Sequence, residues 1–127
     1  MEKLLFLIIS LLLSFNSYAQ TNWSYMTTNQ DGDDYYIEKN SIQNQGNSVT
    51  FWYRSNYKER TKFGDLSSKV QKTFNCRTQE HITRFAIFYD DLNNDGRVTT
   101  KSQPSNSSWA PIIPDTVTWS FYQSLCK

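Results

Sequence analysis

The sequence holds few of the residues that enzymes use for catalysis or for binding metals. Its 127 residues include one histidine, His81, and two cysteines. A catalytic triad or a zinc site needs a histidine beside an activated nucleophile or further ligands, and both cysteines are expected to be used in a disulfide. We therefore interpret His81 as an ordinary polar residue at the start of a strand, and we predict a protein that is not an enzyme and needs no cofactor.

Glycine, proline and net charge are also scarce. Four glycines and three prolines are too few for a fibrous or low-complexity chain. Thirteen basic residues nearly balance twelve acidic ones, which leaves a net charge of +1. Because the basic residues between positions 58 and 84 are interleaved with acidic ones, they predict a mixed solvated surface and no nucleic-acid partner.

The one long hydrophobic run lies near the N-terminus. Lys3 precedes an apolar stretch over residues 4–13, and Ser17-Tyr18-Ala19 has the small residues of a cleavage site. The run is too short to span a bilayer, so residues 1–19 are predicted to be a secretory signal peptide and residues 20–127 a single domain without a membrane span. The residue directly after the predicted signal peptide is Gln20, not a cysteine. We therefore expect an exported protein, in the periplasm or secreted to the cell surface, without a lipid-anchor cysteine.

Export determines what the two cysteines do. An exported chain meets an oxidising compartment, where a pair of cysteines normally forms a disulfide. A bond between Cys76 and Cys126 closes a loop of about 50 residues and contributes about 4 kcal/mol in the chain-entropy model. A redox role is the alternative, but it usually needs an activating motif beside the cysteine, and neither cysteine has one.

Aromatic residues, in contrast, are plentiful, with four Trp, eight Tyr and eight Phe. Aromatic and β-branched residues favour strands. Alternating patterns predict strands at residues 35–37, 49–54, 67–76, 82–89 and 97–100. The face that carries Val70, Phe74 and Cys76 is apolar except for Lys72. The expected fold class is α+β: an antiparallel sheet of about five to six strands with a C-terminal helix packed on one face and tethered by the disulfide.

The C-terminal segment has the pattern of that helix. Pro114 and Asp115 are predicted to open it, with the Asp115 carboxylate capping free backbone N–H groups. A broad apolar arc follows, made of Val117, Trp119, Phe121, Tyr122, Leu125 and Cys126. Because Cys76 shares a strand face with Val70 and Phe74, the disulfide predicts that the helix covers this face.

The opposite face of the predicted sheet has its own aromatic residues. Alternation along residues 82–89 places Thr83, Phe85, Ile87 and Tyr89 on one side. Together with Trp52, the residues Phe85, Ile87 and Tyr89 form the predicted binding face, since an exposed aromatic patch usually marks an interaction site. The alternative is that loops cover these residues or that both faces contribute to the core, because one sequence does not fix the strand register.

Residues 91–96 hold a dense group of oxygen ligands. Asp91, Asn93 and Asp95 match the first three ligand positions of a calcium loop, and Gly96 matches its turn glycine. The closing acid should fall at position 102, which is Ser102, and the flanking segments have strand patterns rather than helical ones. We interpret the segment as a hairpin turn without a metal, and a weak calcium site is the alternative.

A series of short motifs runs along the whole domain. In order they are Tyr35-Tyr36-Ile37, Ser41-Ile42, Val49 to Arg54, Ser67-Ser68-Lys69, Asn75-Cys76, Tyr89-Asp90, Trp109, Ile113-Pro114 and Cys126. In this order the motifs resemble the bacterial surface-adhesin protein E family. The resemblance implies an antiparallel sheet with a C-terminal helix held to it by a disulfide, and the binding of host extracellular-matrix or serum proteins.

Two functions follow from these patterns. The leading prediction is an exported, adhesin-like module that binds extracellular-matrix proteins, serum proteins or other envelope proteins through its sheet. The alternative is a structural or accessory protein of the periplasm with no external ligand.

Overall fold

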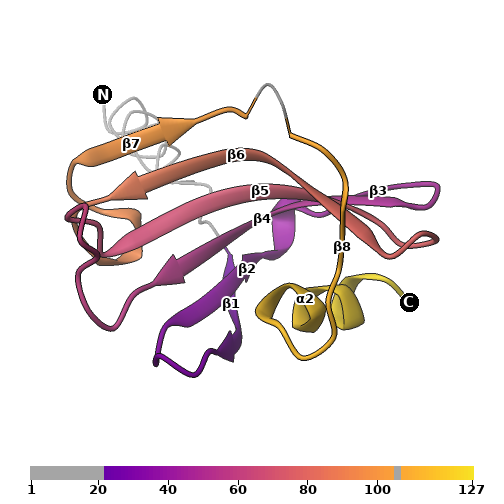
Figure 1. Cartoon of the computed structure of the whole chain (residues 1–127), viewed down its shortest axis with the longest axis horizontal. Coiled ribbons are helices and arrows are strands. Elements are labelled where there is room, and N and C mark those ends of the chain that lie inside the picture. Colours follow the sequence, from indigo (N-terminus) through magenta and orange to yellow (C-terminus); the bar gives the residue numbers. More distant parts are fainter. Residues whose placement is uncertain (1–21, 105–106) are drawn as a thin grey trace, which may run out of the picture.

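The computed structural model describes residues 22–104 and 107–127 (Figure 1). The predicted signal peptide, residues 1–19, lies outside the described residues. The elements in chain order are β1 (Trp23–Thr28), β2 (Asp34–Glu38), the 3-10 turn η1 (Lys39–Ser41), β3 (Gln43–Gln45), β4 (Ser48–Asn56), β5 (Ser67–Asn75), β6 (Glu80–Tyr89), η2 (Leu92–Asn94), β7 (Val98–Ser102), β8 (Ala110–Pro111) and the helix α2 (Val117–Leu125).

One antiparallel sheet forms the body of the domain. Its main order is β1-β2-β4-β5-β6-β7, with β3 paired to β4 and β8 paired to β6. The α+β fold class is confirmed, and the sheet has eight strands where about five to six were predicted; the short strands β3 and β8 are among those not predicted. β3 contains only Gln and Asn, and β8 has two residues, so neither carries the apolar alternation by which strands are predicted.

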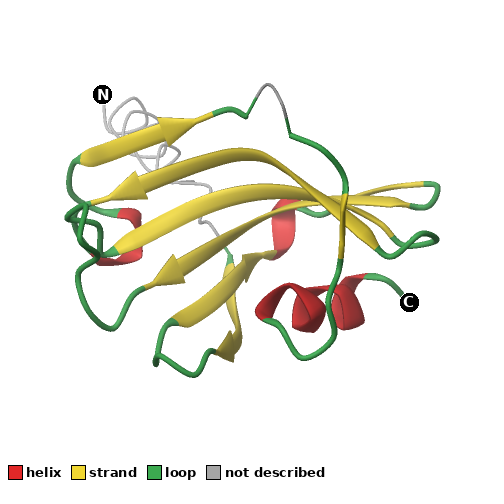
Figure 2. Ribbon diagram, in the orientation of Figure 1, coloured by secondary structure: helices red, strands yellow, loops and turns green. Residues whose placement is uncertain are grey.

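The core lies between one face of the sheet and α2. Phe51 and Phe74 on the sheet and Phe121 on the helix are almost completely buried. The ring centroid of Phe51 lies 4.8 Å from that of Phe74 and 5.5 Å from that of Phe121. The helix therefore covers the face that the disulfide predicts, at the end of the sheet that β8 reaches (Figure 2).

The start of α2 differs from the prediction. The N-cap is Thr116, whose Oγ1 accepts a hydrogen bond from the Trp119 N–H at 3.1 Å, and the prediction of Asp115 as the cap is wrong. Asp115 has a φ of 65°, a left-handed conformation at the turn before the helix. Because Thr116 Oγ1 also donates to the Ile113 carbonyl oxygen at 2.7 Å, one hydroxyl joins the incoming loop to the first helical turn.

Candidate functional site

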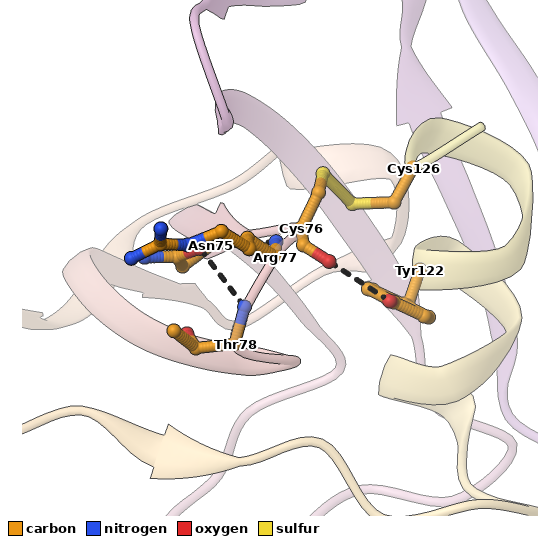
Figure 3. The surroundings of a disulfide bond; sticks show 6 residues. All are labelled: Asn75, Cys76, Arg77, Thr78, Tyr122 and Cys126. Carbon is orange, nitrogen blue, oxygen red and sulfur yellow. Dashed lines mark hydrogen bonds between the residues drawn. A yellow bond between two sulfur atoms is a disulfide. The ribbon is translucent and has the colours of Figure 1, made fainter.

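The disulfide forms as predicted and fixes one end of the molecule. Cys76 follows β5 and is bonded to Cys126, which caps the C-terminal end of α2 (Figure 3). Beside the bond, the Tyr122 hydroxyl donates to the Cys76 carbonyl oxygen at 3.1 Å. In the turn after β5, the Asn75 side chain accepts hydrogen bonds from the backbone N–H groups of Arg77 and Thr78. The helix is thus tethered to the central part of the sheet by a covalent bond and a hydrogen bond.

The face of the sheet opposite α2 is called here the open face. Strand pairing places Trp52 beside Gln71 and Phe85, and it places Lys69 beside Ile87. Tyr89 alternates with Phe88 and lies on the same side at the end of β6. All four residues predicted for the binding face therefore share it. From β1 to β6 the residues of this face include Trp23, Tyr25, Tyr36, Trp52, Arg54, Lys69, Gln71, Phe85, Ile87 and Tyr89, together with Asp34 and Glu38.

A β-bulge in β6 corrects the predicted alternation. Gln71 pairs with Phe85, but the next residue of β5, Lys72, pairs with Thr83, so Arg84 is an extra residue. The prediction that Thr83 shares a face with Phe85 is wrong for this reason. Thr83 lies on the helix side, where its hydroxyl contacts Lys72, while Phe85 remains on the open face.

Cations lie over the aromatic rings of the open face. The guanidinium carbon of Arg54 is 4.6 Å from the ring centroid of Trp23 and 5.2 Å from that of Tyr36. Lys69 Nζ is 4.9 Å from the ring centroid of Trp52. These are distances at which the quadrupole of the ring attracts a cation. Burial lowers the pKa of Arg54, although the neighbouring Tyr36 and Asp95 oppose that shift.

The remaining rings of this face are only partly covered. Trp52 stacks on Phe85 with centroids 6.1 Å apart and planes at 19°. Tyr25 meets Tyr36 edge to face at 5.8 Å. Tyr25 is 58% exposed and Phe85 is 37% exposed, so aromatic surface remains open to a partner.

Lys72 is buried on the helix side of the sheet. It is the one polar residue in the apolar face predicted for β5, and its Nζ lies 2.9 Å from both His81 Nδ1 and Thr83 Oγ1. Burial lowers the pKa of Lys72 to about 8. Burial, and then the charge of Lys72, lower the pKa of His81. In the described part of the chain, no three His, Cys, Asp or Glu side chains gather as they would around a metal.

The loop of the calcium-like motif folds against the sheet. The Asp91 carboxylate accepts a hydrogen bond from the Leu92 N–H at 2.8 Å. Asn56 Nδ2 on β4 donates to Asn93 Oδ1, and the Asn93 N–H donates back to Asn56 Oδ1. The Asn93 carbonyl oxygen accepts from Arg54. Two of the three predicted ligands thus already have partners within the chain. The loop joins β6 to β7 as the predicted turn does, and its calcium binding stays a prediction.

The open-face residues that sequence reasoning missed include Arg54, Trp23 and Tyr36. The available signal was the alternation in β4, which places Arg54 and Trp52 on one side. That alternation does not show which strand lies beside β4 or in which register. Only the pairing of β2, β4 and β5 brings Trp23 and Tyr36 to Arg54.

The geometry defines a class of protein: a small disulfide-tethered α+β domain that covers one face of its sheet with a helix and exposes the other. A family model, surface-adhesin protein E, matches residues 23–127, and the chain belongs to this family. It is therefore an adhesin-like protein, and the family and the disulfide indicate an exported cell-surface protein. Among the residues described, no helix is both long enough and apolar enough to cross a membrane.

Solved structures share the fold. Crystal form II of Haemophilus influenzae protein E matches with a TM-score of 0.60 at 21% identity, over 90% of this chain and 94% of that chain. A second structure of Haemophilus influenzae protein E matches with a TM-score of 0.62 at 19% identity, over 90% of both chains. Protein E from non-typeable Haemophilus influenzae matches with a TM-score of 0.55 at 20% identity, over 90% of this chain and 81% of that chain. No curated protein matches the sequence.

Proposed function

We propose that this protein is a non-enzymatic adhesin-like module that binds another protein through the open face of its sheet. The observation that supports it most is the contrast between the two faces. One face is covered by α2 at one end, while the other keeps Trp, Tyr and Phe rings partly exposed. Aromatic residues and Arg are the side chains most enriched in protein interfaces.

The class of partner follows from the family. Surface adhesins contact host extracellular-matrix and serum proteins or other envelope proteins, and we propose a partner of this kind. The sheet is large enough for it. Six strands about 4.8 Å apart span roughly 25 Å, and a nine-residue strand such as β4 is about 30 Å long. The product, roughly 750 Å², is close to the roughly 800 Å² that each partner contributes to a standard protein interface.

A binding comparison tests the proposal. The mature protein and its Phe85→Ala and Trp52→Ala variants are assayed against a panel of purified matrix and serum proteins and against envelope extract. Phe63→Ala is the matched control, because Phe63 is 75% exposed and lies in the loop between β4 and β5, away from the open face. We expect the open-face variants to lose at least about tenfold in affinity for a partner that wild type and Phe63→Ala bind equally. No partner, or equal losses in all variants, would contradict the proposal.

The location of the protein in the cell distinguishes the proposed function from the periplasmic alternative. Protease added to intact cells should digest a surface-displayed adhesin. If the protein is spared until the cells are lysed, it is periplasmic, and the accessory role becomes the better account.

A further inference from the structure

Two cations meet at the centre of the open face. Arg54 on β4 and Lys69 on β5 are directly opposite each other in the strand pairing, and they are called here the cationic pair. Like charges at directly opposed positions destabilise a sheet. The pair therefore costs folding stability, which calls for a compensating role.

The surroundings hold the cationic pair in place without neutralising it. Rings lie against both cations, and Arg54 Nη1 donates to the Asn93 carbonyl oxygen at 3.3 Å. Arg54 Nε is buried and has no hydrogen-bond partner. Arg and Lys side chains lose much rotamer entropy when an interface fixes them, so positioning them beforehand favours binding.

Carboxylates of the chain are engaged elsewhere. Within residues 22–104 and 107–127 the ion pair present is Arg97 with Asp90, at 3.8 Å and on the surface. Glu38, at one end of the open face, accepts hydrogen bonds from the backbone N–H groups of Asn22 and Asn40. Asp95 is close enough to influence Arg54 electrostatically but forms no ion pair with it. Among the described residues Arg54 and Lys69 thus form no ion pair, although the carboxylates of Asp34 and Glu38 lie on the same face.

We propose that the cationic pair is the recognition centre for an acidic segment of a partner protein, whose Asp or Glu carboxylates bind Arg54 and Lys69 between the flanking rings. The inference rests on the proposed function and adds the chemistry of the partner. Electrostatic complementarity selects partners and fixes their register. Arg54 supplies a planar fork that suits a carboxylate, and Lys69 adds a second charge about one strand spacing away.

The geometry favours a protein over a nucleic acid. Proteins that bind single strands leave aromatic faces free so that bases can stack on them. Here Arg54 lies over Trp23, and Lys69 and Phe85 both lie within stacking distance of Trp52. These rings orient the cations rather than offer a stacking platform.

Synthetic peptides test this inference on the full mature protein. The probe is a soluble twelve-residue peptide rich in Glu and Tyr, and the matched peptide carries Gln at every Glu position. We expect the Glu peptide to bind and the Gln peptide to bind at least about tenfold more weakly, with an affinity for the Glu peptide that falls as salt rises. Equal binding of the two peptides, or tighter binding of heparin or an oligothymidine, would overturn the inference.

Variants locate the site. Arg54→Gln and Lys69→Gln should each weaken binding of the Glu peptide by about tenfold, and Lys58→Gln, an exposed cation in the loop after β4, should change it less than about twofold. Equal losses in all three would show a general charge effect and overturn the inference. Lys69→Met is a second variant that also removes the charge of Lys69. In NMR spectra, the chemical shifts of backbone amides that change on peptide addition should lie mainly on β4 and β5. Changes spread over other elements would count against the site.

The two proposals fail in different ways. If Phe85→Ala removes binding of the protein partner while Arg54→Gln and Lys69→Gln leave it unchanged, the open face remains the interface and the acidic-segment inference falls. If none of the three variants affects the partner, the proposed function itself falls.

Discussion

The two faces of the sheet use the same kind of side chain in opposite ways. On the covered face, Phe51, Phe74 and Phe121 pack ring against ring and are almost fully buried. On the open face, Trp23 and Trp52 lie against Arg54 and Lys69 instead. Aromatic content therefore does not separate core from surface in this protein. The distinction comes from what lies against each ring, which is a helix on one side and cations on the other.

The largest expected effect comes from removing one aromatic ring from each face and comparing the losses of stability. Phe121→Ala leaves a cavity in the core, and we expect the free energy of unfolding to fall by about 3–5 kcal/mol. Phe85→Ala removes a partly exposed ring and should cost less than about 1 kcal/mol. Urea unfolding followed by tryptophan fluorescence measures both values. Similar losses would show that the open face also stabilises the fold as a core does.

Removal of the disulfide tests how much the bond between β5 and α2 contributes to the stability of the covered face. Cys76→Ser, Cys126→Ser and the double variant each lose the same bond, so each should lower the free energy of unfolding by a similar amount, about 2–5 kcal/mol. The double variant should cost little more than either single one, because the two effects are not independent. Mass spectrometry of the non-reduced wild-type protein should show two hydrogens fewer than the reduced form; two free thiols in exported protein would contradict a structural bond.

The buried Lys72 makes the covered face sensitive to alkaline pH. Its pKa is about 8 in the folded protein and about 10.4 in an unfolded chain, so between these values the unfolded chain binds more protons and stability rises with pH. Well below pH 8, Lys72 is protonated in both the folded and the unfolded state, and stability no longer depends on its titration. From pH 7 to 9.5 we expect a gain of about 1–2 kcal/mol.

Lys72→Met should abolish this gain, and Lys62→Met, at an exposed position, should keep it. Urea unfolding at several pH values gives the slopes. Burial raises the pKa of Tyr35, Tyr53 and Tyr57. Near pH 9.5 the unfolded chain, in which the pKa of Tyr is about 10, therefore loses tyrosine protons first, and this slightly opposes the gain. Lys72→Met keeps these tyrosines, so the difference between its slope and that of wild type is due to Lys72. If the free energy of unfolding changes with pH equally in wild type and in Lys72→Met, the assignment of this pH dependence to Lys72 is contradicted.

The smallest expected effect concerns the entry to α2. Thr116→Ala removes the hydroxyl that caps the helix and should cost about 1 kcal/mol. Asp115→Gly should be neutral or slightly stabilising, because glycine adopts the positive φ at this position without strain. Thermal unfolding compares the stability of the two variants. A greater loss of stability for Asp115→Gly than for Thr116→Ala would indicate that Asp115 is the N-cap of α2.

Local patterns predicted much of this fold. Alternation identified the central strands, the apolar arc identified α2, and the cysteine pair predicted which face the helix covers. Export supplied the reason to expect the disulfide. Each of these signals lies within a few residues along the chain or rests on a simple count.

What the sequence did not predict depends on long-range register. The bulge at Arg84 places Thr83 on the face opposite to the predicted one, and no local sequence pattern indicates the bulge. The contact of Arg54 with Trp23 needs β1, β2 and β4 to be aligned, which is a property of three separate segments. The sequence therefore predicted Trp52, Phe85, Ile87 and Tyr89 for the open face but did not predict the contacts of Trp23 and Tyr36 with Arg54.

The disulfide also has a mechanical consequence. A pull on the C-terminus reaches Cys126 first and passes through the bond into Cys76, at the end of the central strand β5. The segment between the cysteines, with β6, β7, β8 and α2, is bypassed and carries no load. Its sequence separation of 50 residues would otherwise extend by roughly 170 Å when pulled straight. The bond thus makes this part of the chain a closed ring that tension from this end does not unravel.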